Sequence, residues 1–330
     1  MMKVILPVAG TGSRLRPFTL SLPKCLLPVA GKALVEHIVA SYSSLPVSEQ
    51  IFITGYKGEL VEEYVESHGF SNTRFVKQNN PQGLGEAISL CLPFVSDDEP
   101  LLIILGDTLF DADLSFLKDE KENVLMVRKV EDPRRFGVAV TDSEGYVTRL
   151  VEKPETFVSN EALVGIYYIA DVKAFRASLE RLIREDIRTR GEYQLTDALQ
   201  MMVEAGSRFR TAPIRYWFDC GTSETFLRTN AKVLADSNPK TGEYPGCKII
   251  PPCYIASTAR ILNSEIGPNV SVGPEVVIEN SRISDSVISE RTILESSEIS
   301  HSIFGGDSEV RGFKGSLLLG DHSKVVSGVL

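Results

Sequence analysis

A short stretch near the start of the chain combines glycines with positively charged residues. Residues 8–31 read VAGTGSRLRPFTLSLPKCLLPVAG and follow the apolar run KVILP. Two glycines lie in this stretch, Gly10 and Gly12, and three cations follow them, Arg14, Arg16 and Lys24. Glycines let backbone N–H groups approach phosphate oxygens without an intervening side chain. Arginine can hold a phosphate through two parallel hydrogen bonds, and lysine adds a compact charge. The stretch therefore predicts a phosphate-binding site.

The spacing of these glycines excludes two familiar phosphate loops. No Gly-x4-Gly-Lys-Ser/Thr pattern is present, so the stretch is not a P-loop. The third glycine of a dinucleotide-binding fingerprint is also missing, because Leu15 stands in its place. A tight turn without a ligand is the alternative interpretation, and the clustered cations favour phosphates.

Two acidic residues follow apolar runs that are typical of strands. Asp107 ends the run LLIILGD, and Asp219 lies in YWFDCGT. In open α/β sheets, ligands bind beyond the carboxyl ends of the strands. Mg²⁺ takes one or two protein carboxylates together with phosphate oxygens, so this pair is a candidate Mg²⁺ site. Simple turn chemistry is the alternative at Asp107, and the sequence alone does not show that the two residues meet.

The elements that must position these residues alternate between apolar runs and amphipathic stretches as far as residue 236. Strands are predicted at 3–8, 50–55, 74–78, 101–107, 123–130, 136–141, 146–153 and 164–170, because these runs are rich in Ile, Leu and Val. Helices are predicted at 32–42, 58–69, 85–94, 171–185, 195–205 and from about 223, where apolar residues recur at helical spacing. Such alternation predicts a three-layer α/β domain with a mostly parallel sheet. Its motif VEKP (151–154) could also be an exposed sheet edge.

The pattern changes after residue 236. DSNPKTGEYPGCKIIPP is a Pro- and Gly-rich linker. Beyond it, apolar residues recur every six and then every five positions, at Ile266, Val272 and Ile278 and at Ile283, Ile288 and Ile293. Repeats this short predict a parallel β-helix, with a small antiparallel sheet as the alternative. The predicted organisation is a large domain over 1–236, a linker over 237–250 and a β-helix over 251–330.

Composition limits the class of protein. The 330 residues are 43% hydrophobic and 24% charged, as in ordinary globular proteins. A net charge of −9 argues against a general nucleic-acid binder. Five scattered cysteines without a CxxC pair and only four histidines argue against a structural zinc site. No signal-type core or membrane-length apolar stretch is evident, so we expect a cytoplasmic protein with no membrane partner.

A set of motifs runs in order along residues 3–236, and each is weak by itself. They are GTGSRLRPFT with PK at 23–24, QNNPQGLGEA at 78–87, LGDTLF at 105–110, FGV at 136–138, VEKP at 151–154, VGIYY at 164–168, GEYQLTD at 191–197 and WFDCGT at 217–222. The ordered set resembles the sugar-1-phosphate nucleotidylyltransferases, or nucleotide-sugar pyrophosphorylases. The match is best to the longer glucose-1-phosphate thymidylyl- and uridylyltransferases, which carry a C-terminal left-handed β-helix.

The resemblance implies a Rossmann-like nucleotidyltransferase domain over 1–236, followed by a left-handed parallel β-helix of hexapeptide-like repeats. It also implies a role for each matching residue. The triphosphate would be wrapped by Gly10, Thr11, Gly12 and Arg14, with Lys24 on the pyrophosphate side, and the nucleobase would be read by Gln78 and Gly83. Mg²⁺ would be held by Asp107 and Asp219, the sugar would be contacted by Gly137, Glu152 and Gly165 and its phosphate by Lys153, and Glu192 is a weaker candidate beside the sugar.

The reaction implied is attack by a sugar-1-phosphate on the α-phosphorus of a nucleoside triphosphate, with dTTP or UTP and glucose-1-phosphate favoured. Alternatives are a mannose-1-phosphate guanylyltransferase, an amino-sugar-1-phosphate uridylyltransferase whose β-helix is an acetyltransferase using His301 or His322, and a non-catalytic regulatory relative. The flat faces and open end of the β-helix favour a homo-oligomer.

Three residues or pairs depart from the family pattern. Phe136 replaces a common tyrosine, and Cys25 follows Lys24 where Pro or Gln is common. Leu84–Gly85 resembles the uridylyl- and thymidylyltransferases more than the guanylyltransferases, and this resemblance favours a pyrimidine base.

Overall fold

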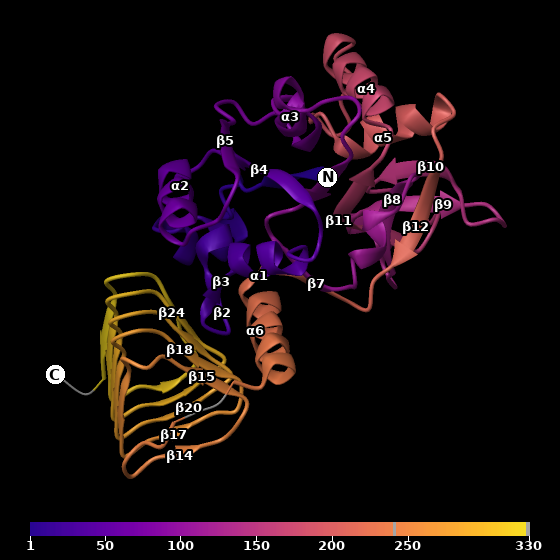
Figure 1. Cartoon of the computed structure of the whole chain (residues 1–330). Helices are drawn as coiled ribbons and strands as arrows, with labels where there is room; N and C mark the ends of the chain where they lie inside the picture. The colour runs from indigo at the N-terminus through magenta and orange to yellow at the C-terminus, as the bar shows by residue number, and fades with distance from the viewer. Residues whose placement is uncertain (240–241, 328–330) are drawn as a thin grey trace. The chain divides into compact units, whose positions relative to one another are not determined.

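The computed structural model describes residues 1–239 and 242–327, apart from the side chain of Asp219. Figure 1 shows the elements along the chain. Packing divides it into two compact units, Met1–Gly10 with Ile38–Trp217 and Thr11–His37 with Phe218–Leu330. The second unit thus takes its first segment from the N-terminal part of the chain. The domain boundaries at 236 and 251, which follow sequence pattern rather than packing, stay a prediction.

The first unit is built on a nine-stranded sheet with the order β10-β9-β11-β6-β1-β4-β5, in which β8 pairs with β11 and β12 pairs with β8. Its strands are β1 (Met2–Pro7), β4 (Val47–Thr54), β5 (Thr73–Lys77), β6 (Leu101–Ile104), β8 (Asn123–Lys129), β9 (Gly137–Thr141), β10 (Val147–Glu152), β11 (Glu161–Ile169) and β12 (Phe209–Pro213). Strands β6, β1, β4 and β5 are parallel, and β11 runs antiparallel to β6, β8 and β9. The sheet is therefore mixed, with its parallel part where the first strands of the chain lie.

Helices complete the layers of this unit. They are α2 (Gly58–Ser67), α3 (Leu84–Ser89), α4 (Val172–Arg184) and α5 (Leu195–Glu204), and α1 (Leu34–Ser41) crosses the boundary between the units. Helices α3, α4 and α5 contact one another, and α2 contacts β4. Side chains of α3, α4 and α5 form one continuous buried core with those of the sheet. The predicted Rossmann-like three-layer fold is confirmed.

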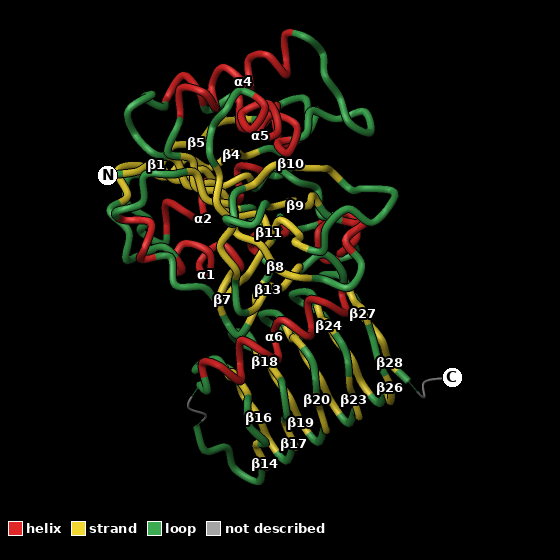
Figure 2. The backbone as a smooth tube through the Cα atoms, turned by 90° about the vertical axis from the view of Figure 1, so that its right-hand side faces the viewer, coloured by secondary structure: helices red, strands yellow, loops and turns green. Residues whose placement is uncertain are grey.

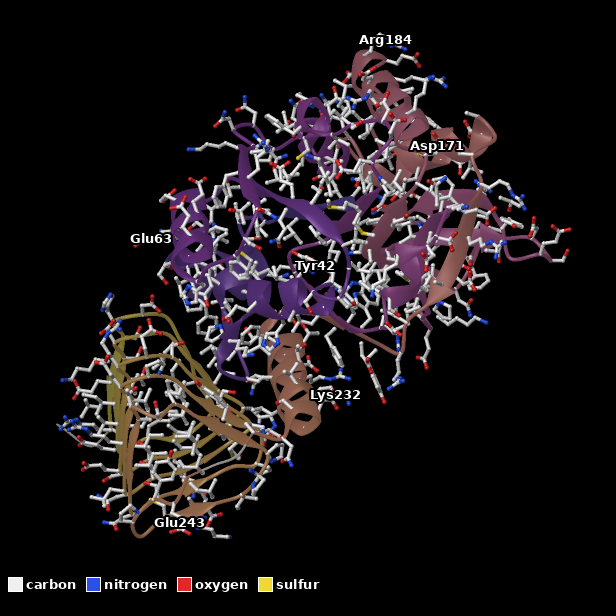
Figure 3. All side chains as sticks on the ribbon, in the orientation of Figure 1. Tyr42, Glu63, Asp171, Arg184, Lys232 and Glu243 are labelled. Carbon is white, nitrogen blue, oxygen red and sulfur yellow. The ribbon has the colours of Figure 1, made fainter. Side chains whose placement is uncertain are left out.

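Helix α4 illustrates why the sequence folds as it does. Its residues Val172, Phe175 and Leu179 recur at helical spacing and are fully buried. The Asp171 carboxylate accepts a hydrogen bond from the Ala174 N–H at 3.0 Å, which satisfies a donor that the first turn leaves open. Asp171 and Arg184 mark the two ends of this helix in Figure 3.

Some sequence-based boundaries differ from those observed. The helix predicted at 85–94 ends at Ser89, and a 3₁₀ turn follows at Leu92–Phe94. Pro93 explains the break, because proline lacks the N–H that a continuing α-helix needs. A separate two-stranded sheet of β7 (Thr108–Asp111) and β13 (Tyr216–Asp219) was not predicted as a pair.

The second unit contains three five-stranded parallel sheets whose rungs are visible in Figure 2. The first sheet is β14 (Lys248–Ile249), β17 (Glu265–Ile266), β20 (Arg282–Ser284), β23 (Glu298–Ser300) and β26 (Lys314–Gly315); the second is β15 (Cys253–Ile255), β18 (Val270–Val272), β21 (Val287–Ile288), β24 (Ile303–Phe304) and β27 (Leu318–Leu319); the third is β16 (Arg260–Leu262), β19 (Val277–Glu279), β22 (Ile293–Glu295), β25 (Glu309–Arg311) and β28 (Lys324–Val326). These sheets confirm the predicted parallel β-helix, consistent with the left-handed type. Its first strand, β14, begins inside the predicted linker.

Serines satisfy backbone groups at one corner of the β-helix. The Ser264 hydroxyl oxygen accepts the Ser281 N–H at 3.0 Å, and the Ser281 oxygen accepts the Ser297 N–H at 3.1 Å. Ser297 in turn accepts the Phe313 N–H at 3.1 Å. Each coil therefore satisfies a buried donor of the next one, which a corner outside the sheets would otherwise leave open.

The remaining elements of the second unit come before the β-helix in the chain. They are 3₁₀ turns at Ser13–Leu15, Phe18–Leu20 and Lys24–Leu26, the hairpin of β2 (Pro28–Val29) and β3 (Lys32–Ala33), and α6 (Ser223–Ser237). Thr222 caps the N-terminus of helix α6, and its side chain forms a capping box with Thr225. Among the described residues, no helix has both the length and the apolar character needed to span a membrane.

Candidate functional site

Asp107 lies directly after β6, where the chain turns toward β7. The Gly106 N–H donates to the Pro7 carbonyl at 3.2 Å, which joins this turn to the end of β1. A Cβ at Gly106 would lie 2.5 Å from the Val8 side chain, so only glycine permits this approach. The half-buried Asp107 carboxylate is thus held at the carboxyl ends of two parallel strands. Ligands of open α/β sheets bind at such an edge.

Glu152 and Lys153 lie at the end of β10 and form a fixed pair. One Glu152 carboxylate oxygen accepts the Thr196 hydroxyl at 2.7 Å, and the other lies 3.2 Å from the Lys153 ammonium. The Glu152 side chain is only 10% exposed. Lys153 has a left-handed backbone (φ 44°), and its N–H donates to the Phe136 carbonyl at 3.0 Å. The site therefore offers one oriented carboxylate and one cation side by side.

Two glycines line the same region. A Cβ at Gly137 would lie 3.0 Å from the Glu152 carboxylate and 3.1 Å from the Thr196 hydroxyl. Any side chain there would press on this hydrogen-bonded pair. Gly165 has a φ of +83° in the irregular part of β11, and its carbonyl accepts the Leu105 N–H at 2.9 Å. Its conformation favours glycine, and its hydrogen bond with Leu105 holds the chain just before Asp107.

A buried tyrosine connects these two groups of residues. Tyr167 is 5% exposed, and burial raises the pKa of its hydroxyl. The negative charges of Glu152 and Asp107 raise that pKa further. Because Coulomb effects fall with distance, both carboxylates lie within electrostatic reach of one phenol. The structure thus brings Glu152 and Asp107, which are 45 residues apart in sequence, into one neighbourhood.

Sequence reasoning did not single out Thr196 and Asp197, although both belong to the quoted motif GEYQLTD. Burial raises the pKa of Asp197, as does the Glu152 carboxylate, while a hydrogen bond with Thr189 opposes the shift. Among the described residues, one buried oxygen of Asp197 has no hydrogen-bond partner. These residues come from the start of α5, so the helix supplies direct support to Glu152.

The loop after β5 contains the residues predicted to read the nucleobase. The Gln78 side-chain amide donates to the Glu86 carboxylate at 2.6 Å, and Gln78 is buried. A Cβ at Gly83 would lie 2.5 Å from the Tyr193 carbonyl. The Tyr193 N–H donates to the Gln82 carbonyl at 2.8 Å, so this loop is clamped beside the segment that carries Glu192. The Glu192 carboxylate itself accepts the Gln194 amide at 3.0 Å.

The glycine-rich segment belongs to the second unit from Thr11 onward. Gly12 has a φ of +60°, and its carbonyl accepts the Thr19 hydroxyl at 2.9 Å. A Cβ at Gly12 would lie 2.8 Å from the Thr19 methyl group and 3.2 Å from the Lys24 stem. Thr11 and Arg14 are exposed, while Lys24 is partly buried. Contacts within its own segment therefore hold the glycine turn in place, and the Arg14 side chain is exposed to solvent.

Cys25, which follows Lys24 in the glycine-rich segment, is buried. Burial raises the pKa of the Cys25 thiol to about 12, so this residue is not a nucleophile at neutral pH. Over residues 1–239 and 242–327, no group of three or more His, Cys, Asp or Glu side chains is placed to hold a metal ion. The predicted Mg²⁺ pair has two members, and the side chain of Asp219 lies outside the described residues.

The predicted residues therefore divide between the units. Gly10, Gln78, Gly83, Asp107, Gly137, Glu152, Lys153, Gly165 and Glu192 lie in the first unit, and Thr11, Gly12, Arg14, Lys24 and Asp219 in the second. Within the first unit, Glu152 contacts both Thr196 and Lys153, and the charges of Glu152 and Asp107 both raise the pKa of Tyr167.

Comparison with known sequences places this geometry in context. The model of the family described as "Nucleotidyl transferase" matches residues 3–236. The low-salt glycan biosynthesis nucleotidyltransferase Agl11 of Haloferax volcanii is 32% identical, with 92% of each chain covered. A glucose-1-phosphate thymidylyltransferase of Streptomyces griseus is 27% identical over 98% of this chain and 99% of its own. The bifunctional protein GlmU of Methanocaldococcus jannaschii is 34% identical over 72% of this chain, and the match spans 55% of that protein.

Solved structures give a similar result. A chain from Bacillus anthracis, named as a glucose-1-phosphate thymidylyltransferase in complex with sucrose, is 28% identical with a TM-score of 0.61. The match covers 74% of this chain and 98% of that one. A UDP-glucose pyrophosphorylase in complex with UDP-glucose has a TM-score of 0.62 at 23% identity, over 72% of this chain and 99% of its own, which shows the shared fold.

Proposed function

This chain belongs to the nucleotidyl transferase family, and we propose that it transfers a nucleotidyl group from dTTP or UTP to glucose-1-phosphate. The broader class, sugar-1-phosphate nucleotidyltransferase, follows from its family and relatives. The full-length similarity to a glucose-1-phosphate thymidylyltransferase supports the choice of base and sugar. Leu84–Gly85, which favours a pyrimidine base, supports the same choice.

The geometry around Glu152 carries this proposal. Its carboxylate is fixed by Thr196 and Lys153, so it offers an oriented acceptor for sugar hydroxyls. The adjacent Lys153 ammonium, on a side chain 36% exposed, suits the phosphate of the same substrate. Gly137 leaves the space in front of this pair without a side chain. A carboxylate for hydroxyls beside a cation for a phosphate matches a sugar phosphate.

The proposed reaction needs no general base, because the attacking phosphate oxygen is already ionised at neutral pH. That oxygen forms a bond to the α-phosphorus of the triphosphate, while the bond from this phosphorus to the bridging oxygen breaks and pyrophosphate leaves. The main obstacle is the mutual repulsion of two polyanions. Arg14, Lys24 and Lys153 would offset this repulsion and align the reacting atoms.

Mg²⁺ is the proposed cofactor, held by Asp107 and Asp219. The half-buried Asp107 carboxylate at the strand ends fits the preference of Mg²⁺ for carboxylate oxygens completed by phosphate oxygens. When bound, the ion would supply charge stabilisation to the phosphates. The protein residues would then bind and orient both substrates around it.

A substrate grid tests this proposal. The purified chain is supplied with Mg²⁺, each of dTTP, UTP, GTP, CTP and ATP, and each of glucose-, mannose- and N-acetylglucosamine-1-phosphate, and pyrophosphate release is measured. We expect the highest kcat/KM with dTTP or UTP and glucose-1-phosphate. A preference for GTP with mannose-1-phosphate would overturn the proposed specificity, and no release from any pair would support the non-catalytic alternative.

Relatives named bifunctional keep one alternative open, an amino-sugar-1-phosphate uridylyltransferase with an acetyltransferase β-helix. The candidate residues His301 and His322 are both exposed and have left-handed backbones (φ 48° and 57°). An assay of acetyl transfer from acetyl-CoA to glucosamine-1-phosphate would detect this activity. The homo-oligomer, the cytoplasmic location and the boundaries at 236 and 251 are retained as parts of the proposal, and light scattering would measure the oligomeric state.

A further inference from the structure

The segment that carries the phosphate-binding cations packs with the C-terminal part of the chain. Residues 11–37 follow β1 of the first unit, yet they form one compact unit with residues 218–330. Several of their apolar side chains face this partner. One small cavity is lined jointly by Leu15, Phe18 and Leu22 of the segment, by Phe226 of α6 and by Val287 and Ile303 of the β-helix. The β-helix and α6 therefore cover the apolar side of the segment, while Arg14 remains exposed.

The hairpin at the end of this segment rests directly on a β-helix strand. Ala30 and Gly31 form its two-residue turn and have φ values of 48° and 83°. Both residues require the left-handed conformation that this tight hairpin turn uses. A Cβ added to Gly31 would lie 2.3 Å from the ring of Tyr254 in β15. The turn is therefore seated against that ring with no room for a side chain.

One buried side chain joins the hairpin, α6 and the β-helix. Asn230 of α6 is 0% exposed. Its carbonyl oxygen accepts the Ala30 N–H at 2.9 Å and the Ser271 hydroxyl at 2.7 Å. Its amide nitrogen donates to the Asn269 carbonyl at 3.4 Å. Removing this side chain would leave the Ala30 N–H and the Ser271 hydroxyl without their acceptor, which is costly for groups away from water.

From these contacts we infer that Asn230 is a positioning residue for nucleotide binding, because it fastens the cation-bearing segment to the β-helix. The inference rests on the proposed function, in which Arg14 and Lys24 bind the triphosphate. Asn230 touches neither substrate in this account and acts through the segment. The β-helix is then part of the nucleotide site's support, in addition to any role in assembly.

Hydrogen exchange and kinetics of Asn230→Ala in the full chain test this inference. We expect faster amide exchange in residues 12–33 and unchanged exchange in the first-unit strands. We also expect the KM for dTTP to rise about tenfold, since the three hydrogen bonds of Asn230 are lost, including the one to the hairpin, while the KM for glucose-1-phosphate changes less than about twofold. Equal changes in both KM values, or unchanged exchange in 12–33, would overturn the inference.

Thr229→Val is the matched control. Thr229 is the neighbouring residue of α6 and is 1% exposed, but its hydroxyl donates to the Thr225 carbonyl of its own helix. This variant disturbs α6 to a similar degree without touching the hairpin, so exchange in 12–33 and both KM values should match the wild type. A rise in dTTP KM equal to that of Asn230→Ala would show a general effect of α6 and overturn the inference.

Tyr254→Ala is the second variant, for the case in which Asn230→Ala does not fold. It removes the ring beneath Gly31 from the half-buried outer face of the β-helix, so the fold should survive. We expect faster exchange in 28–33 and a higher dTTP KM. If neither change is observed, the inference is overturned. Exchange is read without substrate, so it decides whether the segment is fastened even if the proposed reaction fails.

Discussion

The sheet unit and the β-helix use the same aliphatic residues in different ways. In the β-helix, equivalent residues stack from coil to coil, as Ile266, Ile283 and Ile299 do. Buried polar residues in its described part are serines and one threonine, which bond backbone groups of their own or adjacent coils, except for Ser271, which bonds the Asn230 side chain. The sheet unit instead holds the nearly buried Glu152, whose charge raises the pKa of the buried Tyr167, and Asp197 next to Thr196. Regular repetition gives stability with few buried charges, whereas the irregular sheet edges bring carboxylates together.

The largest expected effect separates chemistry from stability. Asp107→Ala and Lys24→Ala should each lower kcat by roughly 10²-fold or more while the melting temperature stays close to that of the wild type. The reason is that each removes a charge needed for the phosphates. Pyrophosphate release measures turnover, and Asp98→Ala, at an exposed loop position, is the control. Near-normal release from either variant would refute the assignment.

A variant in the β-helix should have the opposite effect, a loss of stability without a loss of turnover. Leu294 is fully buried and stacks between Ile278 and Val310 of the adjacent coils. Leu294→Ala should lower the free energy of unfolding by about 2–5 kcal/mol, because a cavity remains in a closely packed core. Denaturant unfolding measures the loss. Turnover well below the melting temperature should be unchanged, and a large fall in kcat under those conditions would break the contrast between the two regions.

A smaller effect sharpens the account of the sugar site. Thr196→Val removes the hydroxyl that orients Glu152 and should raise the KM for glucose-1-phosphate about tenfold, in line with a hydrogen bond to a charged group. The KM for dTTP should stay constant. Thr148→Val is the control. Thr148 lies on β10, the strand that carries Glu152, but its exposed hydroxyl donates to the Val140 carbonyl. Equal responses of the two variants would contradict the role of Thr196.

The pH dependence of stability should report on His37. Burial lowers the pKa of this histidine below its ordinary value, and its ring nitrogen lies 2.9 Å from the Val29 carbonyl. Protons therefore bind the unfolded state more tightly, so this contribution is complete above about pH 6.5 and is lost as pH falls through the folded pKa. His37→Gln should show a shallower loss of unfolding free energy between pH 7 and 5. Identical slopes would contradict this assignment.

The smallest effect concerns thiol labelling. Cys25, Cys91, Cys220 and Cys253 are buried, and Cys247 is partly exposed. A small alkylating reagent at neutral pH should therefore modify Cys247 first, with little effect on turnover. Mass spectrometry of peptides locates the label. Modification of Cys25 before Cys247 in the native protein would show that its segment opens more readily than its packing indicates.

Much of this structure could be predicted from local sequence. Continuous apolar runs predicted the sheet strands, and short apolar repeats predicted the coils. The family resemblance was confirmed by the match over residues 3–236. The roles of individual site residues stay predictions. Thr196 was not singled out because its partner Glu152 is 44 residues away, and only the fold brings the two together. Likewise, the contact between Ala30 and Asn230 joins residues 200 apart, which no periodicity reveals.

The shared packing of residues 11–37 with the C-terminal region limits how such chains can be recombined. An engineer who exchanged the β-helix for that of a relative would also replace Tyr254 and Ser271, which receive the hairpin and Asn230. Residues 11–37 would then meet a surface they do not fit. A chimera should succeed only if the donor's N-terminal segment and α6 travel with its β-helix, so the useful crossover points lie at two places in the chain, near Gly10–Thr11 and His37–Ile38, in addition to one before Phe218.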